Sequence, residues 1–241
     1  MTVSTAVAQS IDQYVPGQVF GYRDLPLYQS KPSNVVQIVN RLVKKNEIKR
    51  LSKGKFYKPK QSVIGDLKPS DSELLKTVMF KNGAVRGYIT GTALFNQLGL
   101  TTQVPRTISV ATKGSRQKKD FGTIRISLVP ARAPFRSTDI PLLQYLDVLR
   151  NIKKIPDAGI NESLGIMERK FSDLDDKQIK RVQYLALEYY GAQARALTGL
   201  LVSRLNRGLE KRLKESLSPL TRFKLGLDND IWPEKRAWNI Q

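Results

Sequence analysis

Apolar positions recur with a helical period at the start of the chain. The opening stretch predicts one amphipathic helix, because its apolar side chains lie about one turn apart: Val3, Val7, Ile11 and Tyr14. Pro16 and Gly17 follow as a stop signal. The next run, YRDLPLYQ, leaves room for a short helix of about one or two turns before Pro26 interrupts it. The first 30 residues therefore predict a helix followed by a shorter one.

The stretch KPSNVVQIVNRLVKKNEI predicts a helix with two contrasting faces. At about 100° per residue, six apolar side chains share one half of the helical wheel: Val35, Val36, Ile38, Val39, Leu42 and Val43. The other half collects polar side chains: Ser33, Asn34, Gln37, Asn40, Arg41, Lys44 and Lys45. We expect Ser33 or Asn34 to cap the start of this helix. A helix with a merely solvated face shows the same pattern, so the segments around it decide between the two interpretations.

The segment EIKRLSKGKFYKPK predicts a basic β-hairpin directly after that helix. Two short strand-like runs flank a turn at Ser52, Lys53 and Gly54, where glycine can adopt positive φ, and Pro59 ends the second run. A helix, a short helix, a helix with a polar face and a basic hairpin are, in that order, the elements of a winged helix-turn-helix. We therefore expect such a domain, with a DNA-binding role, over residues 1–66.

The polar helix face has the chemistry that reads duplex DNA. Asn and Gln can pair with adenine edges and Arg with guanine, so we expect base contacts from Asn34, Gln37, Asn40 and Arg41. Hydroxyl and ammonium groups suit phosphates, so we expect backbone contacts from the remaining polar positions and from the wing: Ser33, Lys44, Lys45, Lys49, Lys53 and Lys55.

The distribution of charge supports this interpretation. The chain carries 41 Lys and Arg residues against 21 Asp and Glu residues, a net charge of +20. Ten of the basic residues and a single acid, Glu47, lie between Lys31 and Lys60. Such a local excess attracts polyanions.

The remainder of the chain predicts a second domain over residues 70–241. A connection with Gly, Pro and Ser, SVIGDLKPSDSE, places the boundary near Pro69, and Ser70 or Ser72 caps a helix over Glu73–Phe80. Two strand-like segments, TISVAT and TIRISLV, flank a basic turn over Lys113–Lys119. From about residue 138 the apolar spacing is helical. The expected fold class is thus α+β: a winged helix-turn-helix, then a mixed α/β region to about residue 137, then helices.

The composition excludes several kinds of catalytic site. With no Cys and no His, the chain has no cysteine nucleophile, no Ser/His/Asp triad and no thiolate or imidazole metal ligand. Asp173, Asp175 and Asp176 could serve a metal-dependent nuclease, but acids before a basic stretch are typical of a helix start. We expect no enzyme activity, no cofactor and no metal. No apolar run is long enough to span a membrane, and no leader peptide is evident, so we expect a cytoplasmic protein.

The stretch GYITGTALFNQLGLTTQVPRTISVAT resembles the AbiEi-type antitoxins of bacterial toxin–antitoxin systems, most distinctively in its run GLTTQVP over Gly99–Pro105. The resemblance extends over most of the chain. It implies a regulator that binds inverted repeats in its own promoter and counteracts a toxin of the nucleotidyltransferase type, directly or indirectly, with a role in phage defence. Residues 33–45 and 49–58 would then contact the DNA, and the second domain would carry the antitoxin activity.

Two other functions fit the same residues. The first is a winged-helix transcription factor whose second domain senses a small molecule. The second is a metal-dependent nuclease that uses the winged helix for docking. The second domain is itself basic, so it could also contact DNA or RNA.

Overall fold

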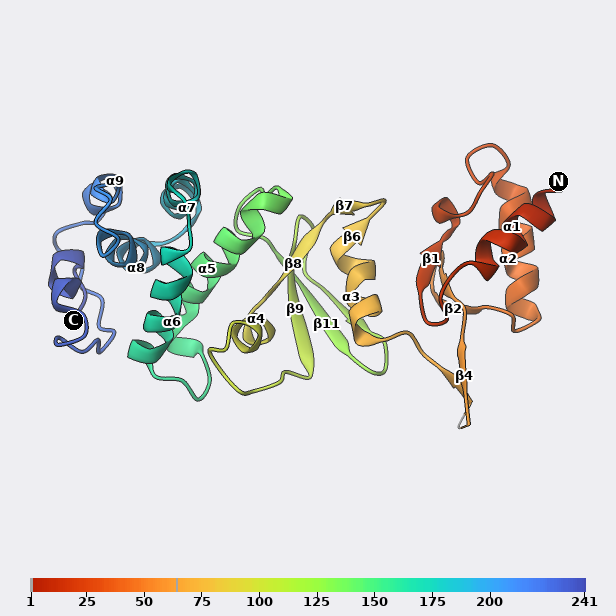
Figure 1. Cartoon of the computed structure of the whole chain (residues 1–241), viewed down its shortest axis with the longest axis horizontal. Coiled ribbons are helices and arrows are strands. Elements are labelled where there is room, and N and C mark those ends of the chain that lie inside the picture. The colour runs from red at the N-terminus through yellow and green to blue at the C-terminus, as the bar shows by residue number, and fades with distance from the viewer. Residues whose placement is uncertain (1, 64) are drawn as a thin grey trace. The chain divides into compact units, whose positions relative to one another are not determined.

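The computed structural model describes residues 2–63 and 65–241 (Figure 1). The chain folds as two compact units, Met1–Arg86 and Gly87–Gln241. The first unit holds helices and small sheets, and the second holds a mixed four-stranded sheet followed by helices. This order confirms the expected α+β class. None of the helices in the described residues is long and apolar enough to cross a membrane.

The first unit begins with the elements of a winged helix-turn-helix in the expected order. They are α1 (Val3–Asp12), β1 (Val19–Gly21), the 3-10 turn η1 (Tyr22–Asp24), α2 (Pro32–Lys44), β2 (Lys49–Ser52) and β3 (Lys55–Tyr57). Strand β3 lies between β1 and β2 and pairs antiparallel with both. Between β2 and β3, Gly54 has a φ of 71°, which suits glycine at a tight turn. The short helix expected in YRDLPLYQ is a single 3-10 turn.

One hydrophobic core unites these elements. It collects the apolar faces of α1 and α2 and the inward side chains of the sheet: Val7, Ile11, Phe20, Leu25, Val35, Val39, Leu42, Ile48 and Phe56. Because the apolar positions of α2 follow the helical period, burying them leaves its polar half in solvent. The packing of this core therefore fixes which face of α2 is presented outward.

Helix α2 begins one residue before its expected caps. Pro32 is its first residue, and Lys31 holds the N-cap position without a side-chain hydrogen bond. Proline favours a first helical position because a helix start leaves that N–H unpaired in any case. The expectation that Ser33 or Asn34 caps α2 is therefore wrong. Both residues lie inside the first turn and are exposed.

The segment interpreted as a linker contains further structure. Strands β4 (Lys60–Ser62) and β5 (Gly65–Leu67) form an antiparallel hairpin. Helix α3 (Asp71–Met79) follows, and the Ser70 hydroxyl caps it by accepting a hydrogen bond from the Glu73 N–H at 3.4 Å, as expected. A Glu73 carboxylate oxygen also accepts a hydrogen bond from the Val19 N–H of β1 at 3.4 Å. The first compact unit thus continues past Pro69, through α3 and the hairpin of β6 (Phe80–Lys81) and β7 (Ala84–Val85).

The second unit opens with a mixed sheet. Its strands are β8 (Gly87–Thr90), β9 (Thr107–Thr112), β10 (Gln117–Asp120) and β11 (Arg125–Pro130), in the spatial order β10-β11-β9-β8. Strands β9 and β11 run parallel, and the other neighbours are antiparallel. The basic segment interpreted as a turn between TISVAT and TIRISLV therefore contains a strand, and β10 is an exposed edge of the sheet.

The run GLTTQVP forms a well-anchored loop between β8 and β9. Helix α4 (Thr92–Gln97) ends before Gly99, which has a φ of 73°. The Asn96 amide donates a hydrogen bond to the Thr101 carbonyl oxygen (3.1 Å), and the Gln103 amide donates one to the Asp157 carboxylate (2.6 Å). Polar side chains thus hold this loop against the segment before α6.

Helices complete the second unit. They are α5 (Ile140–Asn151), α6 (Ile160–Ser172), α7 (Asp176–Tyr189), α8 (Ala192–Ser203) and α9 (Lys211–Glu215), with the 3-10 turns η2 (Ser137–Asp139), η3 (Ile152–Lys154) and η4 (Pro233–Trp238). Helix α5 lies between the sheet and the other helices, in contact with β8, α7 and α8 (Figure 1). Helix α8 is the most completely buried of them, as its apolar composition predicts.

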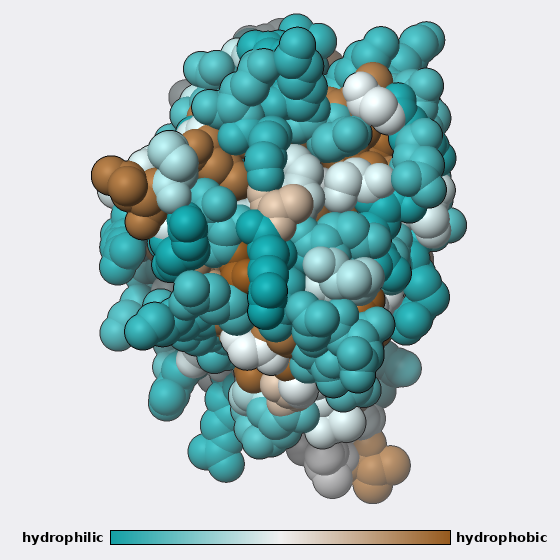
Figure 2. Space-filling view, turned by 90° about the vertical axis from the view of Figure 1, so that its left-hand side faces the viewer, coloured by the Kyte–Doolittle hydropathy of each residue, from teal (hydrophilic) through white to brown (hydrophobic). Residues whose placement is uncertain are grey.

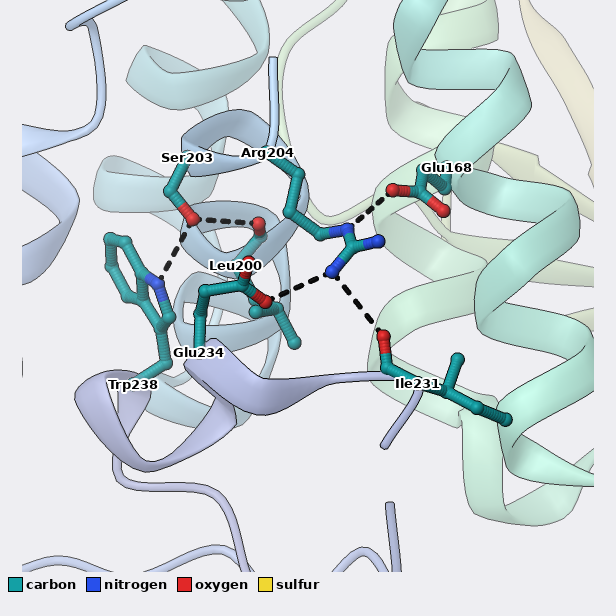
Figure 3. A network of polar contacts seen from close by, with 7 residues as sticks. All are labelled: Glu168, Leu200, Ser203, Arg204, Ile231, Glu234 and Trp238. Carbon is teal, nitrogen blue, oxygen red and sulfur yellow. Dashed lines mark hydrogen bonds and ion pairs between the residues drawn. The ribbon is translucent and has the colours of Figure 1, made fainter. Parts of the chain in front are cut away.

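A network of polar contacts fastens the carboxyl-terminal segment to α8 (Figure 3). The Arg204 guanidinium donates hydrogen bonds to Glu168 (2.5 Å), to Glu234 (2.9 Å) and to the Ile231 carbonyl oxygen (3.3 Å). The Trp238 indole N–H donates to the Ser203 hydroxyl at 3.2 Å. The outer surface over these helices is mostly hydrophilic, with separate apolar spots (Figure 2). The Arg204 contacts show that a basic residue of this region helps to hold the fold together.

Candidate nucleic-acid interface

The exposed half of α2 is the predicted recognition surface. Six of its seven polar side chains are exposed, and Asn40 is half-buried. Ser33, Gln37 and Lys44 lie within about 40° of one another around the helix axis, so they occupy the middle of this face. The middle of the face thus offers a hydroxyl, an amide and an ammonium group to a ligand.

Hydrogen bonds to neighbouring elements hold the two edges of this face. Arg41 donates from Nη2 to the Ser4 hydroxyl of α1 at 2.7 Å. On the other edge, Arg50 of β2 donates from Nη2 to the Asn40 side-chain oxygen at 2.8 Å. The structure therefore brings Asn40 and Arg41 to the predicted surface, but each already has a protein partner. A base contact by either side chain would replace or share that hydrogen bond.

Arg50 is a surface cation that the sequence pattern did not single out. Its guanidinium lies 5.5 Å from the centroid of the Phe56 ring, in cation–π geometry, while it bonds Asn40. The position of Arg50 in a short strand gave no signal of its own, since only pairing in three dimensions brings β2 beside α2. The Asn40–Arg50 pair joins the helix face to the wing.

The lysines expected to contact phosphates fall into two groups. Two of them meet acids, since Lys49 lies 3.2 Å from Asp66 of β5 and Lys45 lies 3.9 Å from Glu47. The ammonium groups of Lys44, Lys53 and Lys55 make no ion pair or hydrogen bond with residues 2–63 or 65–241. These three cations are therefore the most readily available to an external anion.

The Lys49–Asp66 pair also affects the pKa of a neighbouring tyrosine. Burial raises the pKa of Tyr57 on β3, the Lys49 charge lowers it and the Asp66 charge raises it. The tyrosine thus stays un-ionised at neutral pH and adds no negative charge at the base of the wing.

All of the net charge of the first unit belongs to this surface and its surroundings. The segment Lys31–Lys60 has a net charge of +9, and the basic and acidic residues elsewhere in Met1–Arg86 balance. A local excess of this size favours a polyanionic ligand at the α2 face and the wing.

The acidic cluster that could have suggested a nuclease has structural partners. The Asp175 carboxylate accepts a hydrogen bond from the Gln178 N–H at 2.8 Å, which caps α7. Asp176 pairs with Arg207 at 3.1 Å. In residues 2–63 and 65–241, no group of three or more acidic side chains lies together where it could hold a metal ion. Asp175 and Asp176 thus form the start of α7, as the sequence favours, whereas Asp173 is the C-cap of α6.

Comparisons with known proteins give a family without an assigned activity. The structure aligns with the crystal structure of the RV2827C protein from Mycobacterium tuberculosis. The alignment covers 93% of this chain and 85% of that chain, at 11% sequence identity and a TM-score of 0.49. No curated protein matches the sequence. The model of the family of unknown function DUF6088 matches residues 6–134, which is more than half of the chain. The chain therefore belongs to the DUF6088 family.

Proposed function

We propose that this protein is a DNA-binding autorepressor and the antitoxin of a bacterial toxin–antitoxin operon. The observation that carries the DNA-binding half is the exposed polar face of α2 beside a wing whose Lys53 and Lys55 have no ion-pair or hydrogen-bond partner among the described residues. In this proposal α2 lies in the major groove, and Gln37 and Asn34 read base edges. Lys44 and the wing lysines contact phosphates, which supplies affinity without sequence information.

The flanking hydrogen bonds support a pre-organised helix face. The Arg41–Ser4 and Asn40–Arg50 contacts link α2 to α1 and to β2, so the rotation of α2 about its axis is fixed before DNA arrives. Because fewer side chains must be ordered on binding, less entropy is lost. Arg50, stacked on Phe56, joins the residues that approach the DNA in this arrangement.

The antitoxin half of the proposal rests on the resemblance of Tyr88–Thr112 to AbiEi-type antitoxins. In this proposal the second unit counteracts a nucleotidyltransferase-type toxin, by direct binding or indirectly, as part of a cytoplasmic phage-defence system. The protein itself performs no catalysis, and its DNA target is a pair of inverted repeats in its own promoter.

A footprint of the purified protein on the DNA upstream of its own gene tests the repressor half. We expect protection of paired half-sites, with an affinity that falls steeply as the salt concentration rises, because phosphate contacts release counterions. Uniform weak protection without a preferred site would overturn the assignment of an operator.

Expression of the gene next to this one tests the antitoxin half. We expect the neighbour alone to arrest growth and co-expression of this chain to restore it. The Lys44→Glu variant serves as a matched control, since it should lose repression and still rescue growth. A harmless neighbour, or toxicity that this chain does not relieve, would contradict the proposal.

A further inference from the structure

A cavity of about 600 Å³ opens within the second unit. Its walls come from the sheet, the start of α4 and the end of α5. This volume lies in the range of roughly 300–1,000 Å³ that is usual for small-molecule sites. Much of the lining belongs to the β8–α4–β9 stretch that carries the family resemblance.

Four cations stand at the rim of this cavity. Arg116, Arg132, Arg150 and Lys154 are exposed, and their charged groups make no ion pair or hydrogen bond in the described part of the chain. Asp147 is the only acid in the lining. Three guanidinium groups around one opening suit phosphate oxygens, which they can bind in bidentate fashion.

The floor of the cavity has a different chemistry. Tyr88, Phe95 and Ala111 line the cavity and are almost completely buried, so its inner wall is aromatic and apolar. The Tyr88 hydroxyl makes no well-formed hydrogen bond with a described residue, although the Tyr190 hydroxyl lies nearby. A flat ring that carries N–H or hydroxyl groups would satisfy such a floor.

Asp147 determines which end of a ligand lies at the floor. Its carboxylate is 6% exposed and accepts hydrogen bonds from Thr90 (2.8 Å) and from Tyr190 (2.9 Å). Burial raises the pKa of Asp147, and the charges of Arg150 and Arg132 lower it. A carboxylate at this depth repels a phosphate and accepts N–H or O–H donors. The phosphate end of a ligand therefore belongs at the rim and its neutral, donor-rich end at the floor.

We infer that this cavity binds a nucleoside phosphate, with the phosphates between the rim arginines and the base near Tyr88, Phe95 and Asp147. An inorganic anion would leave the aromatic floor unused, and a sugar phosphate lacks the flat ring. A nucleic-acid backbone would need a continuous groove of cations, whereas these four line a single cavity. The cavity lies wholly in the second unit, so ligand binding can be measured without operator DNA. A nucleoside phosphate site of this kind would allow a regulator to respond to a small molecule.

Calorimetric titration of the purified full-length protein tests this inference. The ligands are the four ribonucleoside triphosphates, the matching nucleosides, inorganic triphosphate and ribose 5-phosphate. We expect at least one triphosphate to bind, and its nucleoside, inorganic triphosphate and ribose 5-phosphate each to bind at least about tenfold more weakly. Failure of all four triphosphates to bind, or equal binding of inorganic triphosphate or ribose 5-phosphate, would overturn the assignment.

Variants locate the bound ligand. Replacing two of the three rim arginines, Arg132→Ala with Arg150→Ala, should raise the Kd of that triphosphate by at least about tenfold. The control Arg212→Ala removes an exposed arginine of α9 and should leave the Kd unchanged. Thermal unfolding checks that the double variant folds, and Lys154→Ala provides a milder second variant at the same rim. An unchanged Kd in the folded rim variants would refute the site. Tighter binding of a short single-stranded oligonucleotide than of any triphosphate, through the same arginines, would identify a nucleic-acid groove instead.

Discussion

Three lysines of the α2 face and the wing contrast with three arginines of the carboxyl-terminal helices in their partners. In the helical region, Arg181 bonds Asp139 through two nitrogens, both at 2.8 Å, and Arg204 and Arg207 also meet carboxylates. On the α2 face and the wing, Lys44, Lys53 and Lys55 meet none among the described residues. These three arginines therefore contribute to the fold, whereas these three lysines are available to an external anion. The net charge predicts an affinity for polyanions, but the partners of each cation show which ones hold the fold.

The same comparison extends to the aromatic residues. The Arg204 guanidinium lies 4.8 Å from the Trp232 ring centroid while it binds two carboxylates, so it packs as well as pairs. Changes in this region should lower the free energy of unfolding. Changes at the exposed face of α2 should leave that free energy nearly unchanged and weaken DNA binding. The variants below test this contrast, in order of their expected effect on stability.

The largest expected loss of stability comes from Gly199→Ala in α8. A methyl group there would overlap the Trp238 ring, which covers this glycine, so the carboxyl-terminal segment must move. We expect a loss of about 3 kcal/mol or more in the free energy of unfolding, measured by chemical denaturation. Gly191→Ala is the matched control, because its added methyl meets no atom within 4 Å. Equal stability of the two variants would contradict the packing role of Gly199.

Arg204→Ala should have the next largest effect. It removes the hydrogen bonds to Glu168 and Glu234 (Figure 3). It also removes the contact on Trp232. The expected loss is about 2 kcal/mol, because charge-assisted hydrogen bonds and a stacked cation disappear together. Arg169→Ala removes an exposed arginine of α6 and should leave stability within about 0.5 kcal/mol of the original. A similar loss in both variants would show that the Arg204 network contributes no more to stability than an exposed arginine does.

Asp139→Asn should alter how stability depends on pH. The hydrogen bonds from Arg181 hold the pKa of the buried Asp139 carboxyl below its ordinary value. Such a group stabilises the fold above its unfolded-state pKa, and this contribution is lost as the pH falls through the lower folded-state pKa. We expect the variant to be less stable by about 1.5 kcal/mol at neutral pH. The difference in Tm should shrink as the pH falls into the acid range, and a constant difference would contradict this role of the charge.

Gln37→Ala should have the smallest effect on stability. The side chain is exposed in the middle of the α2 face, so the free energy of unfolding should change by no more than about 0.5 kcal/mol. If Gln37 reads a base, the affinity for the operator should fall by roughly tenfold. The affinity for DNA of unrelated sequence should stay the same, because that binding uses phosphates. An equal loss on both DNAs would show that Gln37 does not contribute to specificity.

Local pattern predicted much of the first unit. The 3.6-residue period separated buried Val35 and Val39 from exposed Gln37 and Lys44, because the spacing of side chains around a helix depends only on the helix itself. The glycine of the wing turn was also predictable, because a tight turn depends on the local sequence. The N-cap of α2 was misassigned because Ser and Asn at a helix start can lie in the first turn as well as at the cap.

Features that depend on distant residues were not predictable. The Arg41–Ser4 hydrogen bond joins residues 37 positions apart, and no pattern in either helix indicates it. The cations at the rim of the cavity lie between positions 116 and 154 of the sequence. Only the packing of α5 on the sheet brings them together. The hairpin of β4 and β5 was interpreted as a linker because its strands are short and exposed on both faces, so they lack an alternating pattern.

The most direct test of the central contrast is a gel-shift titration on the DNA upstream of the gene with two matched charge reversals. Lys44→Glu changes an exposed lysine of the α2 face, and Lys180→Glu makes the same change on the exposed surface of α7. We predict that Lys44→Glu weakens binding by at least roughly tenfold and that Lys180→Glu leaves it nearly unchanged, with the Tm of both variants close to that of the original protein. Equal weakening by both reversals, or normal binding by Lys44→Glu, would contradict the assignment of the α2 face as the DNA-binding surface.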